Sequence, residues 1–201
     1  MLGLVGIISL ISINKMTLFI KNMVCSRCKM IVKSEFERLG MSPLSVDLGE
    51  IILDKTPMPE QLTDLDAALK QYGFERIDDR KSQIIEKIKT TIVELVHYTE
   101  GSVSKNLSAV LTDVLHLDYN YLSNLFSEVE GTTIEKYLIT QRIEKAKELI
   151  LYDELTLSEI ADRLGYSSVG YLSNQFKKVT GSTPTFYKNL KDHERYNIEE
   201  L

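Results

Sequence analysis

Apolar residues between positions 16 and 78 recur with two different periods, so this part of the chain is predicted to mix strands and helices. A period of two is typical of a strand with one buried face, and a period near 3.6 is typical of an amphipathic helix. Leu62, Leu65 and Leu69 form the clearest helical face, in a helix that opens at Pro59. The expected strands are 17–21, 44–48, 51–53 and 74–77, and the expected helices are 29–39 and 59–73.

The resulting order of elements is βαββαβ. This order is typical of the ferredoxin-like arrangement, in which two helices cover one face of a small sheet. Asp78, Asp79 and Arg80 form a polar boundary after the last strand. We therefore predict an α+β domain of ferredoxin-like fold over residues 16–78.

Only helical patterns follow this boundary, beginning with Ile84, Ile88 and Ile92, so the second half is predicted to be all-α. This half also repeats itself at an offset of fifty residues, because YLSN at 121–124 recurs at 171–174. A repeat that keeps its register without a gap predicts a duplicated unit. Further identical pairs are Leu107 and Leu157, Ser108 and Ser158, Phe126 and Phe176, Val129 and Val179, Gly131 and Gly181, Thr133 and Thr183, and Tyr137 and Tyr187.

The second copy carries the sequence signals of a helix-turn-helix. Thr156 and Glu159 form a capping box that opens a short helix, and Gly165 ends it. A second helix is predicted from its N-cap Ser168 to Gly181. An ordinary helical hairpin is the alternative, but the presence of two copies favours a pair of DNA-binding units. The predicted buried stripe is Leu172, Phe176 and Val179, and the predicted outward face is Gly170, Ser173, Asn174 and Lys177.

A longer helix separates the two copies. We expect Thr132 and Glu135 to cap it and the helix to continue to about Ile150. About 18 residues make it about 27 Å long, and successive major grooves on one face of DNA are about 34 Å apart. Both units could therefore contact one face of a duplex. The buried side of this helix is predicted to carry Ile139, Ile143, Ala146 and Ile150.

These segments resemble the AraC-type family of transcription regulators. The resemblance rests on RIEKAKELI at 142–150, LSEIA at 157–161, LGYS at 164–167, YLSNQFKK at 171–178 and GSTP at 181–184. It covers residues 82–191 and implies a seven-helix DNA-binding domain. By resemblance the recognition positions are Val169, Gly170 and Asn174, with Tyr119, Asn120 and Asn124 as their counterparts in the first copy. Outward Ser123 and Ser173 and basic Lys177, Lys178 and Lys188 complete the predicted DNA-binding residues.

The chain as a whole is acidic, with 24 Lys and Arg against 29 Asp and Glu, so its net charge of -5 does not by itself indicate a nucleic-acid partner. The two copies differ, however. Residues 163–191 carry five basic and no acidic side chains, whereas residues 113–141 carry five acidic side chains and one lysine. Because phosphate contacts supply most of the sequence-independent affinity, we expect the second copy to hold DNA. The first copy would contact bases weakly or face a protein such as RNA polymerase.

The two cysteines of the chain, Cys25 and Cys28, form a CxxC motif between the first strand and the first helix. A helix N-terminus favours the thiolate, and two thiolates suit Cu(I) or, with further ligands, Zn(II). In a ferredoxin-like domain this motif resembles the heavy-metal-associated domain of copper chaperones. By that resemblance Cys25 and Cys28 are the metal ligands, Asn22 replaces the usual glycine, and Tyr72 and Phe74 lie on the loop beside the metal.

Two alternatives to a metal site stay open. The thiols could be reduced side chains in a domain that is used for contact or dimerisation. A thioredoxin-like redox site is disfavoured because the motif has no neighbouring tryptophan and the strand order differs from that fold. Met23 and Met30 are expected to fill the core rather than bind metal.

No catalytic constellation stands out, and we predict that the protein is not an enzyme. His97, His116 and His193 lie far from the cysteines in sequence and are expected to be structural or exposed. Two cysteines cannot form a disulfide framework, which favours a reducing cytoplasm.

The first 15 residues are apolar but lack an early basic residue, and they are fewer than the roughly 20 needed to cross a bilayer. They are expected to be an extension before a natural start at Met16, with a membrane-attached tip as the alternative. Residues 192–201 are expected to be a polar tail.

Together these patterns predict a cytoplasmic, sequence-specific regulator that binds double-stranded DNA and responds to a soft metal ion at its CxxC motif. The helix from Ser82 to Tyr98 is the expected coupling element. The alternative is a metal-carrying interaction protein whose helical half binds a protein partner. The sequence is compatible with a monomer or a homodimer and predicts no membrane association.

Overall fold

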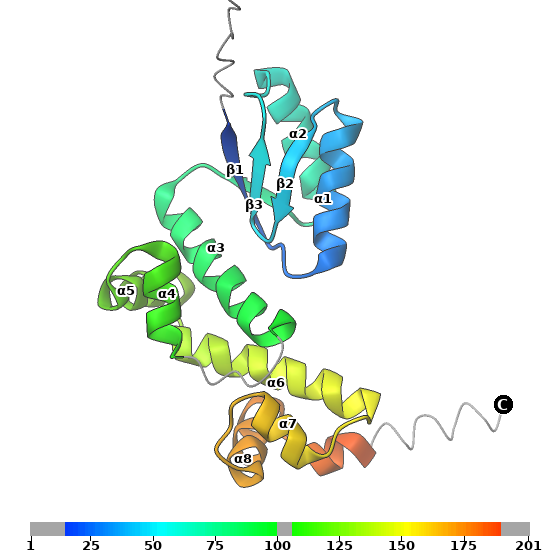
Figure 1. Cartoon of the computed structure of the whole chain (residues 1–201), viewed down its shortest axis with the longest axis vertical. Helices are drawn as coiled ribbons and strands as arrows, with labels where there is room; N and C mark the ends of the chain where they lie inside the picture. Colours follow the sequence, from blue (N-terminus) through cyan, green and yellow to red (C-terminus); the bar gives the residue numbers. More distant parts are fainter. Residues whose placement is uncertain (1–14, 100–105, 190–201) are drawn as a thin grey trace, which may run out of the picture. The chain divides into compact units, whose positions relative to one another are not determined.

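The computed structural model describes residues 15–99 and 106–189, which Figure 1 draws as ribbons. It divides the chain into two compact units, Met1–Glu86 and Lys87–Leu201, here called the N-terminal unit and the helical unit. The expectations for residues 1–14, for His193 and for the polar tail lie outside the described residues.

Between residues 15 and 79 the structure describes four strands and two helices, in the order expected from the sequence pattern. Its sheet has the strand order β2-β3-β1-β4, and every neighbouring pair is antiparallel. The two outer strands are therefore the second and the fourth of the described strands. The elements are β1 (Met16–Lys21), α1 (Ser26–Arg38), β2 (Pro43–Asp47), β3 (Glu50–Leu53), α2 (Pro59–Gln71) and β4 (Glu75–Ile77).

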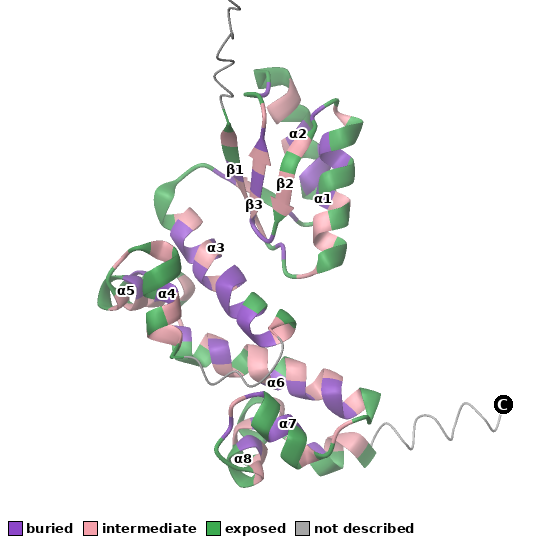
Figure 2. Ribbon diagram, in the orientation of Figure 1, coloured by how far each residue is buried: buried purple, intermediate pink, exposed green. Residues whose placement is uncertain are grey.

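One face of this sheet carries the core of the N-terminal unit. Leu18 of β1 lies opposite Ile51 of β3, and both are buried. Side chains alternate along a strand, so Ile20 points to the same face as Leu18. Phe36 of α1 and Leu65 of α2 are fully buried, and the two helices contact each other and the sheet (Figure 2). The two helices thus cover the apolar face.

The methionines near the CxxC motif have different environments. Met23 is fully buried, as expected, but Met30 is 64% exposed, so its expected place in the core is wrong. α1 buries Val32, Glu35 and Phe36. Met30 lies two residues before Val32, which is about 200° around a helix. Its side chain therefore points away from the sheet.

The stretch that follows β4 is helical, as the pattern predicts. It consists of α3 (Arg80–Val93) and a π-helical turn, η1 (Glu94–Tyr98), instead of one regular helix from 82 to 98. Ile88 and Ile92 are fully buried. The boundary between the two units falls within α3, between Glu86 and Lys87.

The helical unit contains the two repeated pairs and the helix between them. α5 and α8 both end at a glycine in the left-handed region, with φ of 65° at Gly131 and 83° at Gly181. This conformation costs glycine little, and it explains why the residue recurs. The elements are α4 (Leu107–Leu115), α5 (Tyr119–Glu130), α6 (Ile134–Tyr152), α7 (Leu157–Arg163) and α8 (Val169–Thr180).

The same aromatic pair stabilises each copy. The ring centroids of Phe126 and Tyr137 lie 5.8 Å apart, and those of Phe176 and Tyr187 lie 5.5 Å apart. Both phenylalanines are fully buried. The repeat in sequence is therefore also a repeat in packing.

Two expectations for the helical unit need correction. The N-cap of α6 is Thr133, whose hydroxyl accepts a hydrogen bond from the backbone N–H of Lys136, and not Thr132. Val179 is 40% exposed rather than buried. It lies in the last turn of α8, and its counterpart Val129 in the last turn of α5 is 51% exposed. In both copies the buried stripe therefore ends before the last turn of the helix.

Candidate nucleic-acid interface

The second helix-turn-helix is built on side-chain caps and a buried stripe. The hydroxyl of Ser168 accepts a hydrogen bond from the backbone N–H of Tyr171 at 3.1 Å, which starts α8 at Val169. Leu172 and Phe176 are fully buried. The residues between them on the helix must therefore face outward, as the sequence predicts.

The outward face of α8 carries most of the predicted DNA-binding residues. Asn174, Lys177 and Lys178 are exposed, and Ser173 is half-buried. Gly170 is exposed, and a Cβ built on it would approach only the Ser168 hydroxyl, at 3.8 Å. An amide, two ammonium groups and a bare backbone position thus lie on one surface. They suit base-edge and phosphate contacts in a major groove.

Two predicted residues of the second helix-turn-helix have contacts that the sequence pattern does not indicate. Val169 is half-buried and packs against the buried residues that α6, α7 and α8 contribute to the second helix-turn-helix. Lys188 forms an ion pair with Asp153, the residue that follows α6. The pair joins positions 35 residues apart, so no local pattern signals it. A DNA phosphate would have to compete with Asp153 for this ammonium group.

A cation–π contact joins Tyr166, in the turn of the second helix-turn-helix, to Arg142 of α6. The sequence pattern indicates no role for either residue. The Arg142 guanidinium lies over the Tyr166 ring, 5.7 Å from its centroid. Tyr166 also packs edge-on against Tyr171, with centroids 5.8 Å apart. Burial raises the pKa of Tyr166 to about 12 and lowers the pKa of Arg142. The sequence signal that could have revealed this contact is a charged residue, Arg142, on the otherwise apolar side of α6.

The first helix-turn-helix has the same shape but a different surface. The Asp118 carboxylate caps α5 by accepting hydrogen bonds from the backbone N–H groups of Asn120 and Tyr121. Asn120 and Asn124 are exposed, and Ser123 is half-buried. The first unit therefore presents amides where the second also presents lysines.

Three of the five acidic side chains in residues 113–141 form a hydrogen bond or an ion pair within the protein. Asp118 caps α5, Glu130 forms a 2.7 Å ion pair with Lys89, and Glu135 accepts a hydrogen bond from the Tyr119 hydroxyl at 2.5 Å. Asp113 and Glu128 are exposed. The acidic surface of the first unit is thus smaller than the sequence count indicates.

The histidines of the described region are structural or exposed, as expected. His97 is half-buried and forms a 3.1 Å hydrogen bond with Gln141. Burial lowers its pKa. His116 is exposed and ends α4 in the left-handed conformation.

The CxxC motif of the N-terminal unit brings its two sulfur atoms together. Cys25 is the N-cap of α1, Cys28 lies in its first turn, and the two Sγ atoms are 3.2 Å apart. Burial opposes ionisation of Cys25, but hydrogen bonds from the Cys28 thiol and from backbone N–H groups outweigh it and lower its pKa. Burial raises the pKa of Cys28. The described residues contain no cluster of three His, Cys, Asp or Glu side chains that could hold a metal ion. A metal here would have two protein sulfur donors.

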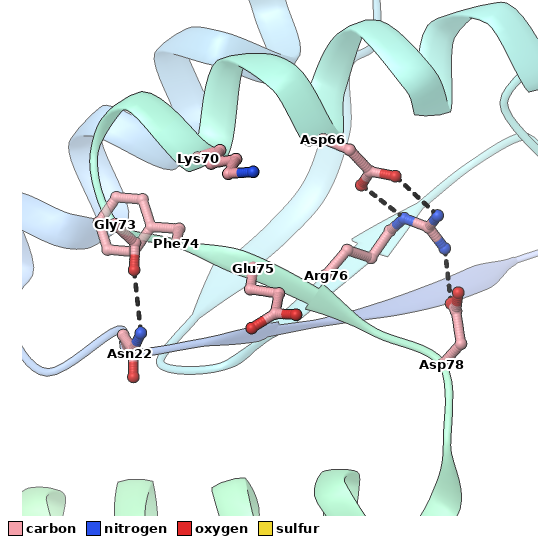
Figure 3. A pocket seen from close by; sticks show the side chains of 8 residues that line it. All are labelled: Asn22, Asp66, Lys70, Gly73, Phe74, Glu75, Arg76 and Asp78. Atoms are coloured by element: carbon pink, nitrogen blue, oxygen red, sulfur yellow. Dashed lines mark hydrogen bonds and ion pairs between the residues drawn. The ribbon is translucent and has the colours of Figure 1, made fainter.

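Asn22 lies on the loop before the motif and has a left-handed backbone conformation. Asn22 has a φ of 71°, which asparagine tolerates better than other residues with a side chain. Its side-chain amide donates a hydrogen bond to the carbonyl of Gly73 at 2.9 Å (Figure 3). Its backbone N–H donates to the Glu86 carboxylate at 2.9 Å. Of the two aromatic residues on the neighbouring loop, Phe74 is buried and Tyr72 is half-exposed.

A cavity of about 500 Å³ lies beside this loop, along β4 and the end of α2. The Arg76 guanidinium lies between two carboxylates there, with hydrogen bonds of 2.9 and 3.0 Å to Asp66 and 2.5 Å to Asp78 (Figure 3). The hydrogen bond with Asp66 is the main cause that raises the pKa of Arg76. Because Arg76 pairs with both Asp66 and Asp78, these three side chains form a structural ion network in the wall of the cavity. It is lined by Asn22, Asp66, Lys70, Gly73, Phe74, Glu75, Arg76 and Asp78.

Comparison with known proteins finds relatives among transcription regulators. Residues 111–189 match a family described as a helix-turn-helix domain. The xylose operon regulatory protein of Escherichia coli (strain K12) is 26% identical over 140 residues, which are 69% of this chain and 34% of that protein. The probable transcriptional regulator LumQ of Photobacterium leiognathi is 30% identical over 149 residues, 74% of this chain and 58% of LumQ.

A similar solved structure is the C-terminal domain of AraT, a response regulator from Geobacillus stearothermophilus. The two sequences are 31% identical. The match covers 56% of this chain and 88% of that chain, and its TM-score is 0.47.

This chain spans about a third of the xylose regulator (34%) and 58% of LumQ. The family match includes both recognition helices, α5 and α8. None of the described helices combines the length and apolar character needed to cross a bilayer. The helical unit therefore contains a helix-turn-helix domain, and the chain is similar to transcription regulators.

Proposed function

We propose that the whole chain is a transcription regulator that binds specific double-stranded DNA through its helical unit. The exposed face of α8 carries this proposal, because it places Asn174, Lys177 and Lys178 together on a capped helix. Asparagine recognises adenine edges, and lysine neutralises phosphates. The family match supports a regulator rather than an enzyme.

In this proposal the two helix-turn-helix units contribute unequally. The second unit holds the duplex, because residues 163–191 carry five basic and no acidic side chains. The first unit contacts bases weakly through Asn120 and Asn124, or it binds a protein such as RNA polymerase through an acidic surface that includes Glu128.

The experiment that tests DNA binding is a selection of duplexes from a randomised library by the full chain. A regulator enriches a shared sequence, and its affinity falls steeply with salt because bound phosphates release counterions. Lys177→Ala should weaken binding to every duplex by a similar factor. Lys55→Ala changes an exposed lysine of the N-terminal unit and is the matched control. No enrichment at any salt concentration would refute the proposal.

We further propose that the N-terminal unit is a ferredoxin-like domain of the heavy-metal-associated type. The antiparallel order β2-β3-β1-β4 supports this, as does a CxxC motif at the start of α1. Two thiols 3.2 Å apart suit a soft ion of low coordination number, such as Cu(I). Zn(II) would need ligands beyond Cys25 and Cys28, because its sites usually have four. Two reduced thiols and a DNA-binding unit are both appropriate to the cytoplasm.

Metal sensing requires that the ion favour one state of the DNA-binding unit. The hydrogen bond from the Asn22 backbone to Glu86 supports a route, because it ties the loop before the CxxC motif to α3, which continues into the helical unit. Anaerobic titration of Cu(I) into the chain with a selected duplex should change its DNA affinity. A Cys25→Ser, Cys28→Ser double variant is the control. An unchanged affinity would remove the sensor and leave the regulator.

The second candidate function is a metal-carrying interaction protein whose helical unit binds a protein. The exposed acids Asp113 and Glu128 of the first unit favour it. This protein would enrich no duplex in the library selection. The selection therefore decides between the two candidates.

A further inference from the structure

One hydrogen bond sets the first recognition helix apart from the second. The hydroxyl of Tyr119, the first residue of α5, donates to the Glu135 carboxylate in the first turn of α6 at 2.5 Å. This length is at the short end of the range for a charge-assisted O–H···O⁻ bond. The bond joins the start of the recognition helix to the start of the connecting helix.

The protonation states of both partners strengthen this bond near neutral pH. Burial and the hydrogen bond to Glu135 raise the pKa of Tyr119, so its phenol stays protonated. The hydrogen bond from Tyr119 lowers the pKa of Glu135, so its carboxylate stays ionised. A tyrosine hydroxyl has one proton to donate. That donor is therefore used within the protein.

The second helix-turn-helix has no equivalent of this hydrogen bond. Fifty residues later, Val169 stands at the position of Tyr119 and Thr185 at the position of Glu135. Valine has no donor and threonine has no charge, and Val169 packs against the core. The bond therefore belongs to the first unit and is a difference between otherwise matching copies.

The first residues of a recognition helix lie close to base edges and phosphates in the major groove. We propose that Glu135 is a positioning residue that holds the Tyr119 hydroxyl away from DNA, and that this bond makes the first unit the weaker DNA-binding half. The inference rests on the proposed DNA-binding function. The ionised carboxylate of Glu135 also repels phosphate at the same place. Asn120 and Asn124 stay exposed beside it and would supply what base contact the unit makes.

A double-mutant cycle on a duplex selected by the wild-type full chain tests this inference. Glu135→Ala should tighten binding about tenfold, because it removes a repelling charge and frees the hydroxyl for DNA. In the Tyr119→Phe background the same change should tighten binding only about threefold, because no hydroxyl is left to free. Circular dichroism checks that each variant stays folded. Glu128→Ala removes an exposed acid of α5 and should give the same gain in both backgrounds.

Glu135→Gln is the second variant, because it removes the charge but keeps an oxygen that accepts the hydroxyl proton. It should tighten binding less than Glu135→Ala, and it serves as the measurement if the alanine variant unfolds. Equal gains from Glu135→Ala with and without the Tyr119 hydroxyl, or equal gains from Gln and Ala, would overturn the inference while the chain remains a DNA-binding protein. A wild-type chain that selects no duplex would refute the proposed function itself, and the inference with it.

Discussion

Gly170 allows a prediction in which folding and DNA binding change in opposite directions. It is the second residue of α8, and a Cβ at this position would meet only the Ser168 hydroxyl, 3.8 Å away. A helix with glycine at one position is less stable than the same helix with alanine there by about 0.5–1 kcal/mol, mainly because glycine loses more backbone freedom on folding. Gly170→Ala should therefore stabilise the helical unit by about that amount and raise its Tm by about 2–6 °C.

The same methyl group should weaken DNA binding. Gly170 is exposed on the face of α8 that also carries Asn174, and a bare backbone lets the helix approach a base pair closely. A steric cost of about 1 kcal/mol corresponds to about a fivefold loss of affinity. Thermal unfolding followed by circular dichroism measures the first effect, and fluorescence anisotropy with a selected duplex measures the second.

Gly131→Ala is the matched control, because it makes the same substitution at the end of α5. Its backbone has a φ of 65°, and a Cβ at this position would meet nothing within 4 Å, so only backbone strain acts. It should destabilise the unit by about 1 kcal/mol. A Gly170→Ala variant that is less stable than wild type would refute the packing argument. Unchanged DNA affinity in a stabilised variant would show that Gly170 does not approach the duplex.

Four further predictions follow from the charges of the molecule. Glu128→Lys should tighten binding to a selected duplex, and an unchanged Kd would contradict the proposed asymmetry between the units. Asp153→Asn releases Lys188 from its ion pair and should steepen the slope of log K against log salt by about 0.9, as one more phosphate contact requires. Iodoacetamide at pH 7.5 should label Cys25 before Cys28, because the pKa of Cys25 is lowered and that of Cys28 is raised; peptide mapping that finds the reverse order would be decisive against it. The capping box lowers the pKa of Glu159, so its contribution is present above the unfolded-state pKa and is lost as the pH falls through the lower folded-state pKa. The Tm difference between wild type and Glu159→Gln should accordingly shrink between pH 6 and pH 3.

The proposed asymmetry between the two helix-turn-helix copies has a mechanistic consequence for the proposed regulator. The unit that binds phosphates strongly supplies residence on DNA, and the weaker unit adds sequence discrimination or stays available to a protein. Both possibilities use the same surface of α5. The Tyr119 and Glu135 bond favours the state in which this surface is available, and its removal would shift the balance toward DNA.

Local chemistry explains what the sequence by itself determined. The order of strands and helices follows from the periods of apolar residues, and the helix ends follow from side chains next to them in the chain, such as the Thr156 and Glu159 capping box. The fifty-residue repeat led to two units with matching aromatic pairs. The outward position of Asn174 also follows from spacing alone, once Leu172 and Phe176 are buried.

The errors of the sequence prediction lie where burial depends on a partner element. Met30 and Val179 are apolar, yet both are exposed, because α1 turns Met30 away from the sheet and Val179 lies in the last turn of α8, past the end of the buried stripe. Val169 packs inward because the core of the second unit reaches the start of α8. The periodicity of apolar residues shows which face of a helix or strand is apolar. It does not show how much of that face a neighbouring element covers.

Only the tertiary structure decided which charged and polar side chains are already engaged. Tyr119 and Glu135 are 16 residues apart, and Asp153 and Lys188 are 35 apart. The Asn22 backbone meets the Glu86 carboxylate across 64 residues. Such pairs depend on where helices and strands meet in space, and no local period encodes that meeting. The sequence therefore determined which residues could contact DNA, and the fold determined which of them are free to do so.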